Sequence, residues 1–173
     1  EALLERCLAP RLPLLEAPHQ SAACLFNGFS EGLPGLVVEV YATTLVIANH
    51  AEVDAVLPET LERMAAFFRV RLPWLTAALL KSRRSAIPDE RLGWLLWGTS
   101  PARKVREHGV VYALNLTLNQ DTSLYLDTRG LRAWLKENCA GLSVLNTFAY
   151  TGSLGAACAA GGAQRVLQID LDK

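Results

Sequence analysis

The fold of this chain is decided by residues 144–155, which read VLNTFAYTGSLG. The apolar run 142–146 predicts a short buried strand, and the small residues 153–160 predict a helix, so Gly152 lies in a strand-to-helix turn. Residues 165–170 then predict a second strand. A strand, a helix and a strand in this order are typical of a doubly wound, parallel α/β sheet.

The turn and the end of the second strand indicate a nucleotide-like cofactor. A glycine at position 152 lets a ligand approach the backbone closely, and Asp170 stands eighteen positions later, where such folds place a carboxylate for ribose hydroxyls. The pattern serves nicotinamide, flavin and S-adenosylmethionine alike, and a purely structural sheet is a further interpretation. Tyr150 occupies the first glycine position of the pyrophosphate-binding motif. This favours S-adenosylmethionine, which carries no phosphate. No P-loop lysine follows, which disfavours nucleotide hydrolysis.

The residues ahead of this stretch predict a different kind of unit. Apolar runs at 36–41 and 44–48 are separated by two residues and predict a β-hairpin. Apolar residues at three- and four-residue steps after Pro58 predict an amphipathic helix. Strict alternation over 111–118 predicts a half-buried strand, and residues 130–138 predict a helix with Leu131, Trp134 and Leu135 on one face.

We therefore expect three segments. Residues 1–20, interrupted by three prolines, form a lead-in helix or linker; residues 21–108 form a middle α+β domain; residues 109–173 form a strand, a helix and the first β-α-β of an incomplete cofactor-binding domain. The first residue is not Met and the last strand ends abruptly, so we expect an excised piece whose parallel sheet stops after its second strand. Exposed apolar faces of that sheet, at Val144, Leu145, Val166 and Ile169, favour self-association, in the simplest case as a homodimer.

Composition sets the remaining limits. No apolar run reaches the roughly 18 residues of a membrane span, and the first residues lack the order of a signal peptide, so we expect a soluble, cytoplasmic protein with no membrane partner. The four cysteines form no Cys-x-x-Cys pair, and the three histidines form no metal-ligand pattern. We expect no metal site and reduced, buried thiols; a catalytic cysteine is the alternative.

The formal net charge is zero, yet basic residues gather in one segment. Residues 81–106 hold seven Lys or Arg against two acidic residues, Asp89 and Glu90. Such a run is either a solvated face or a surface that contacts nucleic-acid phosphates. The basic residues are Lys81, Arg83, Arg84, Arg91, Arg103, Lys104 and Arg106. For the second reading, the candidates that bind RNA are Arg83, Arg84, Arg103 and Lys104.

Several separated motifs resemble those of the bacterial large-subunit ribosomal RNA cytosine-5 methyltransferases, in the same order. They are residues 144–152, residues 124–129 (LYLDTR) before them, and Gly161-Gly162-Ala163 and Ile169-Asp170 after them. Residues 27–41 also resemble the opening of the middle domain of that family. The resemblance extends from Asn27 to Lys173 and implies an α/β fold: a middle α+β domain followed by the start of a Rossmann-like methyltransferase sheet.

The resemblance also implies a cofactor and its contacts. S-adenosyl-L-methionine would lie in a pocket lined by Asn146, Phe148, Tyr150, Thr151 and Gly152, and Asp170 would hold its ribose. Asp127 and Arg129 would lie at the cofactor cleft, with the Asp127 carboxylate on the cofactor's amino group. The alternative for this pair is a helix cap by Asp127 and a surface ion pair of Arg129.

The implied reaction is methyl transfer to C5 of a cytosine in large-subunit ribosomal RNA, in which a cysteine thiolate first adds to the ring. Guanine methylation in ribosomal RNA, a non-catalytic RNA- or partner-binding module and a nicotinamide-dependent oxidoreductase are the alternatives. The chain departs from the family at Ser123, usually glycine, and at Thr128, usually glutamine. The family's RNA-binding module is not recognisable before Asn27, and its Asp-Pro-Pro and cysteine motifs are expected beyond Lys173. We therefore name no catalytic residue and expect no methyl transfer by the chain alone.

Overall fold

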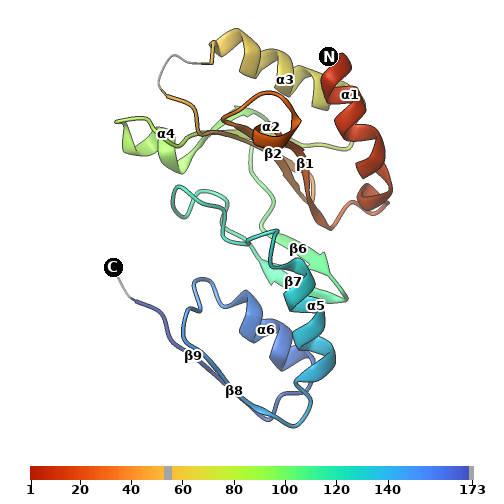
Figure 1. The fold of residues 1–173 in the computed structure, drawn as a ribbon, viewed down its shortest axis with the longest axis vertical. Helices are drawn as coiled ribbons and strands as arrows, with labels where there is room; N and C mark the ends of the chain where they lie inside the picture. The colour runs from red at the N-terminus through yellow and green to blue at the C-terminus, as the bar shows by residue number, and fades with distance from the viewer. Residues whose placement is uncertain (53–55, 172–173) are drawn as a thin grey trace.

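The computed structural model describes residues 1–52 and 56–171. Its elements form two successive groups, which Figure 1 shows one above the other, with a small hairpin between them. The N-terminal group contains a five-stranded sheet, and the C-terminal group contains two helices and a parallel pair of strands. The α/β fold class predicted from the sequence is confirmed.

The first sheet has the strand order β1-β2-β3-β4-β5. The predicted hairpin is confirmed, because β2 and β3 pair in antiparallel fashion with Tyr41 opposite Thr44. Strands β3 and β4 run parallel, and helix α3 connects them. The bounds are β1 Ala22–Asn27, β2 Leu36–Tyr41, β3 Thr44–Asn49, α3 Pro58–Arg71, β4 Ala77–Ser82 and β5 Trp94–Trp97, with short helices α2 at Gly28–Glu31 and α4 at Pro88–Leu92.

The main core lies between this sheet and the helices above it. Helix α3 buries Leu61, Met64 and Phe68, as its periodicity predicts. Helix α1 (Ala2–Leu8) and the 3₁₀ helix η1 (Ala9–Leu15) pack into the same core through Leu4, Leu8 and Leu15. The sequence predicted a lead-in helix or linker over residues 1–20; the structure has helices there, and their buried leucines belong to the first core. Pro10 is tolerated because it stands in the first turn of η1, where its missing N–H costs no helical hydrogen bond.

A hairpin of β6 (Lys104–Glu107) and β7 (Val110–Ala113) joins the two groups. The strand predicted over 111–118 is therefore shorter, although the burial alternation continues to Leu116. Beyond Ala113 the backbone turns to other partners: the Asn115 N–H donates to the Ser123 hydroxyl (2.8 Å). The predicted domain boundary at residue 108 falls in the turn of this hairpin. A second core of the hairpin and the sheet's other face, including Tyr41, Leu79, Val105, Tyr112 and Leu116, holds the groups together.

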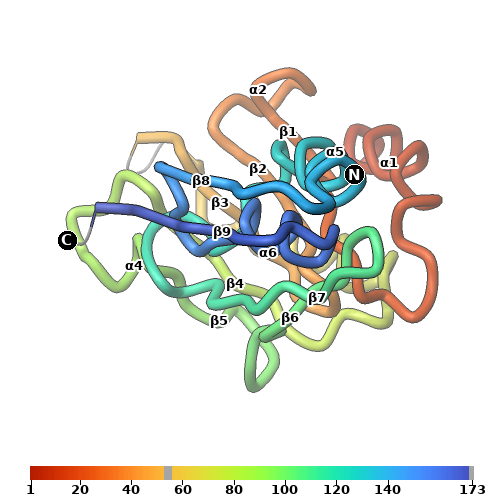
Figure 2. The backbone as a smooth tube through the Cα atoms, turned by 90° about the horizontal axis from the view of Figure 1, so that it is seen from below, coloured from red at the N-terminus to blue at the C-terminus, as the bar shows by residue number. Residues whose placement is uncertain are grey.

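The C-terminal group follows the predicted rhythm of helix, strand, helix and strand. The elements are α5 (Arg129–Asn138), β8 (Ser143–Asn146), α6 (Ser153–Ala160) and β9 (Arg165–Gln168). Strands β8 and β9 pair in parallel, with Ser143 opposite Arg165, and Figure 2 shows them side by side. Helix α6 packs on α5 and on β7.

One face of this parallel pair is open to solvent. Leu145 and Ile169 are half-exposed or more (59% and 50%), as predicted, whereas Val144 and Val166 are less exposed. The apolar face predicted for α5 is also exposed, since Trp134 is 57% accessible, and the buried residue of that helix is Arg132. No helix in the described ranges is long and apolar enough to span a bilayer.

Candidate cofactor-binding site

The turn between β8 and α6 is the centre of the candidate site. Two of its residues have left-handed backbone angles, Tyr150 (φ 48°) and Gly152 (φ 84°), and Gly152 is the N-cap of α6. The Gly152 N–H donates to the Ala149 carbonyl at 2.7 Å, which closes the turn. A side chain at position 152 would be strained at this φ value. Glycine is therefore required by the turn itself.

The packing around Gly152 differs from the sequence-based explanation. A Cβ atom built at Gly152 would lie 2.9 Å from Nε2 of Gln168 in β9, and one at Gly155 would clash with the same side chain. Asn146 also donates to Gln168 through its amide (3.4 Å). The glycines thus let α6 approach the end of β9. The sequence-based explanation was different, namely that Gly152 lets a cofactor approach the backbone. Gln168 was missed because no local motif marks it.

Asp170 and the turn meet at the carboxyl edge of the parallel pair. The Asp170 carboxylate accepts hydrogen bonds from the backbone N–H of Tyr150 and of Leu171. Asp170 is exposed, and an ionised carboxylate offers about four acceptor positions, so two remain for a ligand. Asp170 therefore lies beside the turn, and its role toward a cofactor ribose stays a prediction.

The side chains of Tyr150 and Thr151 point to a neighbouring loop, residues 119–124. The Tyr150 hydroxyl lies 3.1 Å from both Asn119 Oδ1 and the Thr122 carbonyl. The Thr151 hydroxyl donates to the Ser123 carbonyl. Burial raises the pKa of Tyr150, so the phenol stays protonated and donates. These two residues position the turn through their side chains, while Phe148 projects into solvent at 87% exposure.

The same loop is held from the other side by the first sheet. Lys81 on β4 donates to the carbonyls of Asn119 (2.9 Å) and Asp121 (3.1 Å). The Tyr41 hydroxyl on β2 lies 3.1 Å from the Leu124 carbonyl, and Arg83 forms an ion pair with Asp121. The loop therefore connects the N-terminal sheet with the cofactor turn through hydrogen bonds on both sides.

Burial gives this polar cluster unusual protonation properties. Burial and the nearby Arg83 lower the pKa of Lys81 to about 8. Burial also raises the pKa of Glu39, whose carboxylate accepts from the Tyr41 hydroxyl at 2.9 Å. Sequence reasoning counted Lys81 among solvent-facing basic residues, but the structure buries it to 1% exposure. A single lysine in an apolar strand gives no local signal of whether its side chain is solvated or buried.

Asp127 and Arg129 make no hydrogen bond to the turn within the described parts of the chain. Thr128 is the N-cap of α5, and Arg129 donates to the Ala22 carbonyl at 3.1 Å. The alternative of an Asp127 cap with an Arg129 surface ion pair is therefore not what the structure shows. The segment 125–128 is held by the buried Arg132, which donates to the Tyr125 carbonyl and the Thr128 hydroxyl.

The four basic candidates for RNA binding lie at opposite ends of the first sheet. Arg83 and Arg84 follow β4 and form ion pairs with Asp121 and Glu52. Arg103 and Lys104 are exposed, with no ion pair among the described residues, and lie beside the start of β3, where the Ala102 N–H donates to the Thr44 hydroxyl (2.7 Å). The length of β4 lies between the two pairs, because Thr44 is paired with its first residue, Ala77, and Arg83 follows its last residue, Ser82. Arg103, Lys104 and Arg106 line a cavity of about 270 Å³.

Comparisons with known proteins identify the family of this chain and structures with the same fold. The model of the family described as S-adenosylmethionine-dependent methyltransferase matches residues 36–173. The chain is 32% identical over 177 residues to a ribosomal RNA large subunit methyltransferase of Deinococcus radiodurans, covering 99% of this chain and 43% of the relative.

It is 29% identical over 171 residues to ribosomal RNA large subunit methyltransferase I of Shewanella amazonensis, covering 97% of this chain and 43% of the relative. A solved structure described as a methyltransferase from Streptococcus mutans has the same fold, with a TM-score of 0.84 and 24% identity over 99% of this chain and 44% of that one. The chain spans less than half the length of these proteins.

Proposed function

Because this chain belongs to the S-adenosylmethionine-dependent methyltransferase family, we propose that its C-terminal group forms the ribose side of an S-adenosylmethionine cleft. We further propose that the whole protein methylates a base of large-subunit ribosomal RNA, as the names of its relatives suggest. The observation that carries the proposal is the exposed Asp170 carboxylate beside a left-handed turn, at the carboxyl edge of two parallel strands.

The residues present fit this cofactor. Asp170 retains acceptor positions for two ribose hydroxyls, and the exposed Phe148 ring offers an apolar surface for a planar base. Tyr150 and Thr151 fix the turn that carries Phe148 and contacts Asp170. When bound, the cofactor supplies a methyl group on a sulfonium, and the role of these residues is to hold it in one orientation toward the acceptor base.

For the acceptor we propose C5 of a cytosine, a reaction that needs a thiolate nucleophile. Cys7, Cys139 and Cys158 are buried, and burial raises the pKa of Cys158 to about 11 and also raises that of Cys24. Thiols with raised pKa values are protonated at neutral pH and react poorly. We therefore assign no nucleophile to the four cysteines of this chain.

The cofactor assignment is tested by Asp170→Ala. Loss of a charged hydrogen-bond acceptor costs about 1.5–3 kcal/mol, so S-adenosylmethionine affinity should fall about tenfold to a hundredfold in calorimetric titrations of the protein. Asp89→Ala, an exposed acidic residue on α4, is the matched control and should bind like the wild type. Equal affinity of all three proteins would remove Asp170 from the site.

The substrate is tested by incubating the whole protein, with this chain alone as the inactive comparison, with radiolabelled cofactor and unmodified large-subunit ribosomal RNA. We expect label in the RNA and 5-methylcytidine on nucleoside mass spectrometry. Detection of methylguanosine would show that the target base is guanine and not cytosine. Absence of transferred label would contradict the proposed activity.

A further inference from the structure

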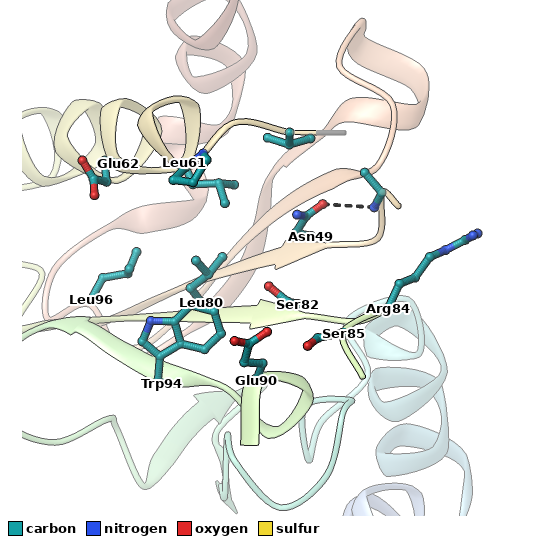
Figure 3. Close-up of a pocket in the computed structure, with 13 residues that line it drawn as sticks. Asn49, Leu61, Glu62, Leu80, Ser82, Arg84, Ser85, Glu90, Trp94 and Leu96 are labelled. Atoms are coloured by element: carbon teal, nitrogen blue, oxygen red, sulfur yellow. Dashed lines mark hydrogen bonds between the residues drawn. The ribbon is translucent and has the colours of Figure 1, made fainter. Parts of the chain in front are cut away.

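A separate cavity lies in the N-terminal group, at the carboxyl ends of the parallel strands β3 and β4. Asn49 ends β3 and Ser82 ends β4, and both line it together with Leu61 and Glu62 from the first turns of α3 (Figure 3). The cavity volume is about 430 Å³. Ligands of α/β folds characteristically bind at the carboxyl ends of parallel strands, and the β3-α3-β4 crossover supplies this setting away from the turn 147–152.

Apolar groups form the floor of this cleft. Leu80 of β4 and Leu96 of β5 line it, and Trp94 is paired with Leu80 in the sheet. Figure 3 shows the Trp94 ring beneath Leu80 and beside Glu90, on the side of the cleft opposite α3. Trp94 keeps 38% of its surface exposed. An exposed indole at the edge of a cleft is a stacking surface for a planar ring.

Polar groups stand around this floor with hydrogen-bonding capacity to spare. The Asn49 Oδ1 atom accepts from the Ala51 N–H (3.0 Å), which leaves its amide N–H groups as donors. Across the described part of the chain, neither the Ser82 hydroxyl nor the Glu90 carboxylate takes part in a hydrogen bond. The cleft thus offers donors on one strand end and a carboxylate acceptor next to the indole.

The charges of the cleft select the part of a nucleotide that enters. Among the described residues that line it, Glu62 and Glu90 face a single cation, Arg84, which already forms an ion pair with Glu52. Two carboxylates repel a phosphate, but a carboxylate accepts a hydrogen bond from the exocyclic amino group of a base. A base can enter the cleft while its sugar-phosphate backbone stays outside, near Arg84. The phosphate then avoids the two carboxylates, and the amino group of the base reaches them.

We propose that this cleft binds one unpaired nucleobase with an exocyclic amino group from the RNA that the protein recognises. The inference rests on the proposed function for its substrate class. Trp94 stacks on the base, Glu90 accepts from the amino group, and Asn49 and Ser82 donate to the ring or carbonyl acceptors, as in the recognition of splayed bases in single-stranded RNA. Uracil has no amino group and leaves Glu90 without a donor, so cytosine is preferred over uracil.

The test uses the protein and short fluorescent oligocytidine and oligouridine strands, with binding followed by anisotropy. We expect tighter binding of oligocytidine by the wild type. Trp94→Ala should weaken that binding about fivefold to a hundredfold, the typical effect of removing one stacking side chain, whereas Trp94→Phe keeps a ring and most of the affinity. Glu90→Gln should bring the two affinities together. Trp134→Ala, which removes a more exposed indole on α5 outside the cleft, should change neither affinity.

The proposal fails if Trp94→Ala and Glu90→Gln bind both strands like the wild type, or if the wild type shows no preference for oligocytidine. Glu90→Gln and Trp94→Phe keep the test valid where Trp94→Ala is unstable. Methyl transfer to ribosomal RNA, measured on the same proteins, separates the two ideas. Transfer with unaltered oligonucleotide binding in the variants overturns only the cleft, and absent transfer with the expected binding pattern overturns only the proposed activity.

Discussion

At the residue scale, the ammonium group of Lys81 has the least ordinary surroundings. Burial and the nearby Arg83, which follows β4, lower the pKa of Lys81 from 10.5 to about 8, and they outweigh the opposite effect of Asp121 in the loop and Glu39 on β2. The unfolded chain has the ordinary pKa and binds more protons than the folded chain between these values. The stability contributed by this group therefore rises with pH between about 8 and 10.5, and is unchanged below that window.

We predict that the wild type gains stability relative to Lys81→Met as the solution becomes alkaline. The difference in unfolding free energy should shift toward the wild type by about 2 kcal/mol between about pH 7.5 and about pH 9.5. Denaturant unfolding at several pH values measures it, and taking the difference cancels groups that titrate equally in both proteins. Parallel pH profiles would show that Lys81 titrates as an ordinary lysine.

At the element scale, a buried ion pair joins the β6–β7 hairpin to α5. Arg132 donates to Glu107 through Nη2 (2.6 Å) and Nε (2.8 Å), and both side chains are fully buried. The guanidinium also lies over the Tyr112 ring at 5.5 Å. The pair fixes the start of α5 and the segment 125–128 relative to the hairpin, because Arg132 binds the backbone of that segment too.

Breaking one side of this pair should cost more than removing both. Arg132→Met leaves a buried, uncompensated carboxylate and should lower the unfolding free energy by about 3–5 kcal/mol, whereas Arg132→Met with Glu107→Leu replaces the pair by apolar groups and should recover much of that loss. Urea unfolding of the two single variants and the double variant measures the coupling. Additive losses would contradict a direct pair.

At the scale of the whole molecule, the basic side chains at the two ends of the first sheet differ in how free they are to contact a phosphate. Arg103 and Lys104 are exposed, while Arg83 and Arg84 hold acidic partners. Each cation that neutralises a phosphate adds to the salt dependence of binding. Removing one such cation should reduce the slope of log affinity against log salt concentration by about one. The two pairs can thus be distinguished by salt titration.

We predict that Arg103→Ala with Lys104→Ala reduces the slope of log affinity against log salt by about one to two for ribosomal RNA binding. Arg83→Ala with Arg84→Ala, the matched pair at the other end, should reduce it less, because these guanidinium groups already have acidic partners. An undiminished slope in the first variant would mean that these charges only solvate the surface.

The local sequence was sufficient to predict several of the elements, among them those that surround the candidate site. Hydrophobic periods, Pro58 and Gly152 are signals carried by residues close together in the chain, and the hairpin β2–β3, helix α3, helix α6 and the parallel pair β8–β9 all follow from such signals. Asp170 reaches the turn because adjacent parallel strands end at the same sheet edge.

Only the tertiary structure decided which polar groups are buried and what they hold. Lys81 finds its carbonyl partners 38 and 40 residues away, and Arg132 finds Glu107 25 residues away. The helical face of Leu131 and Trp134 stays exposed, because Arg132 turns inward to its buried partner. The physical reason is that a charged side chain in a periodic pattern has the same local surroundings whether it is solvated or buried. Its burial depends on partners that long-range packing brings to it.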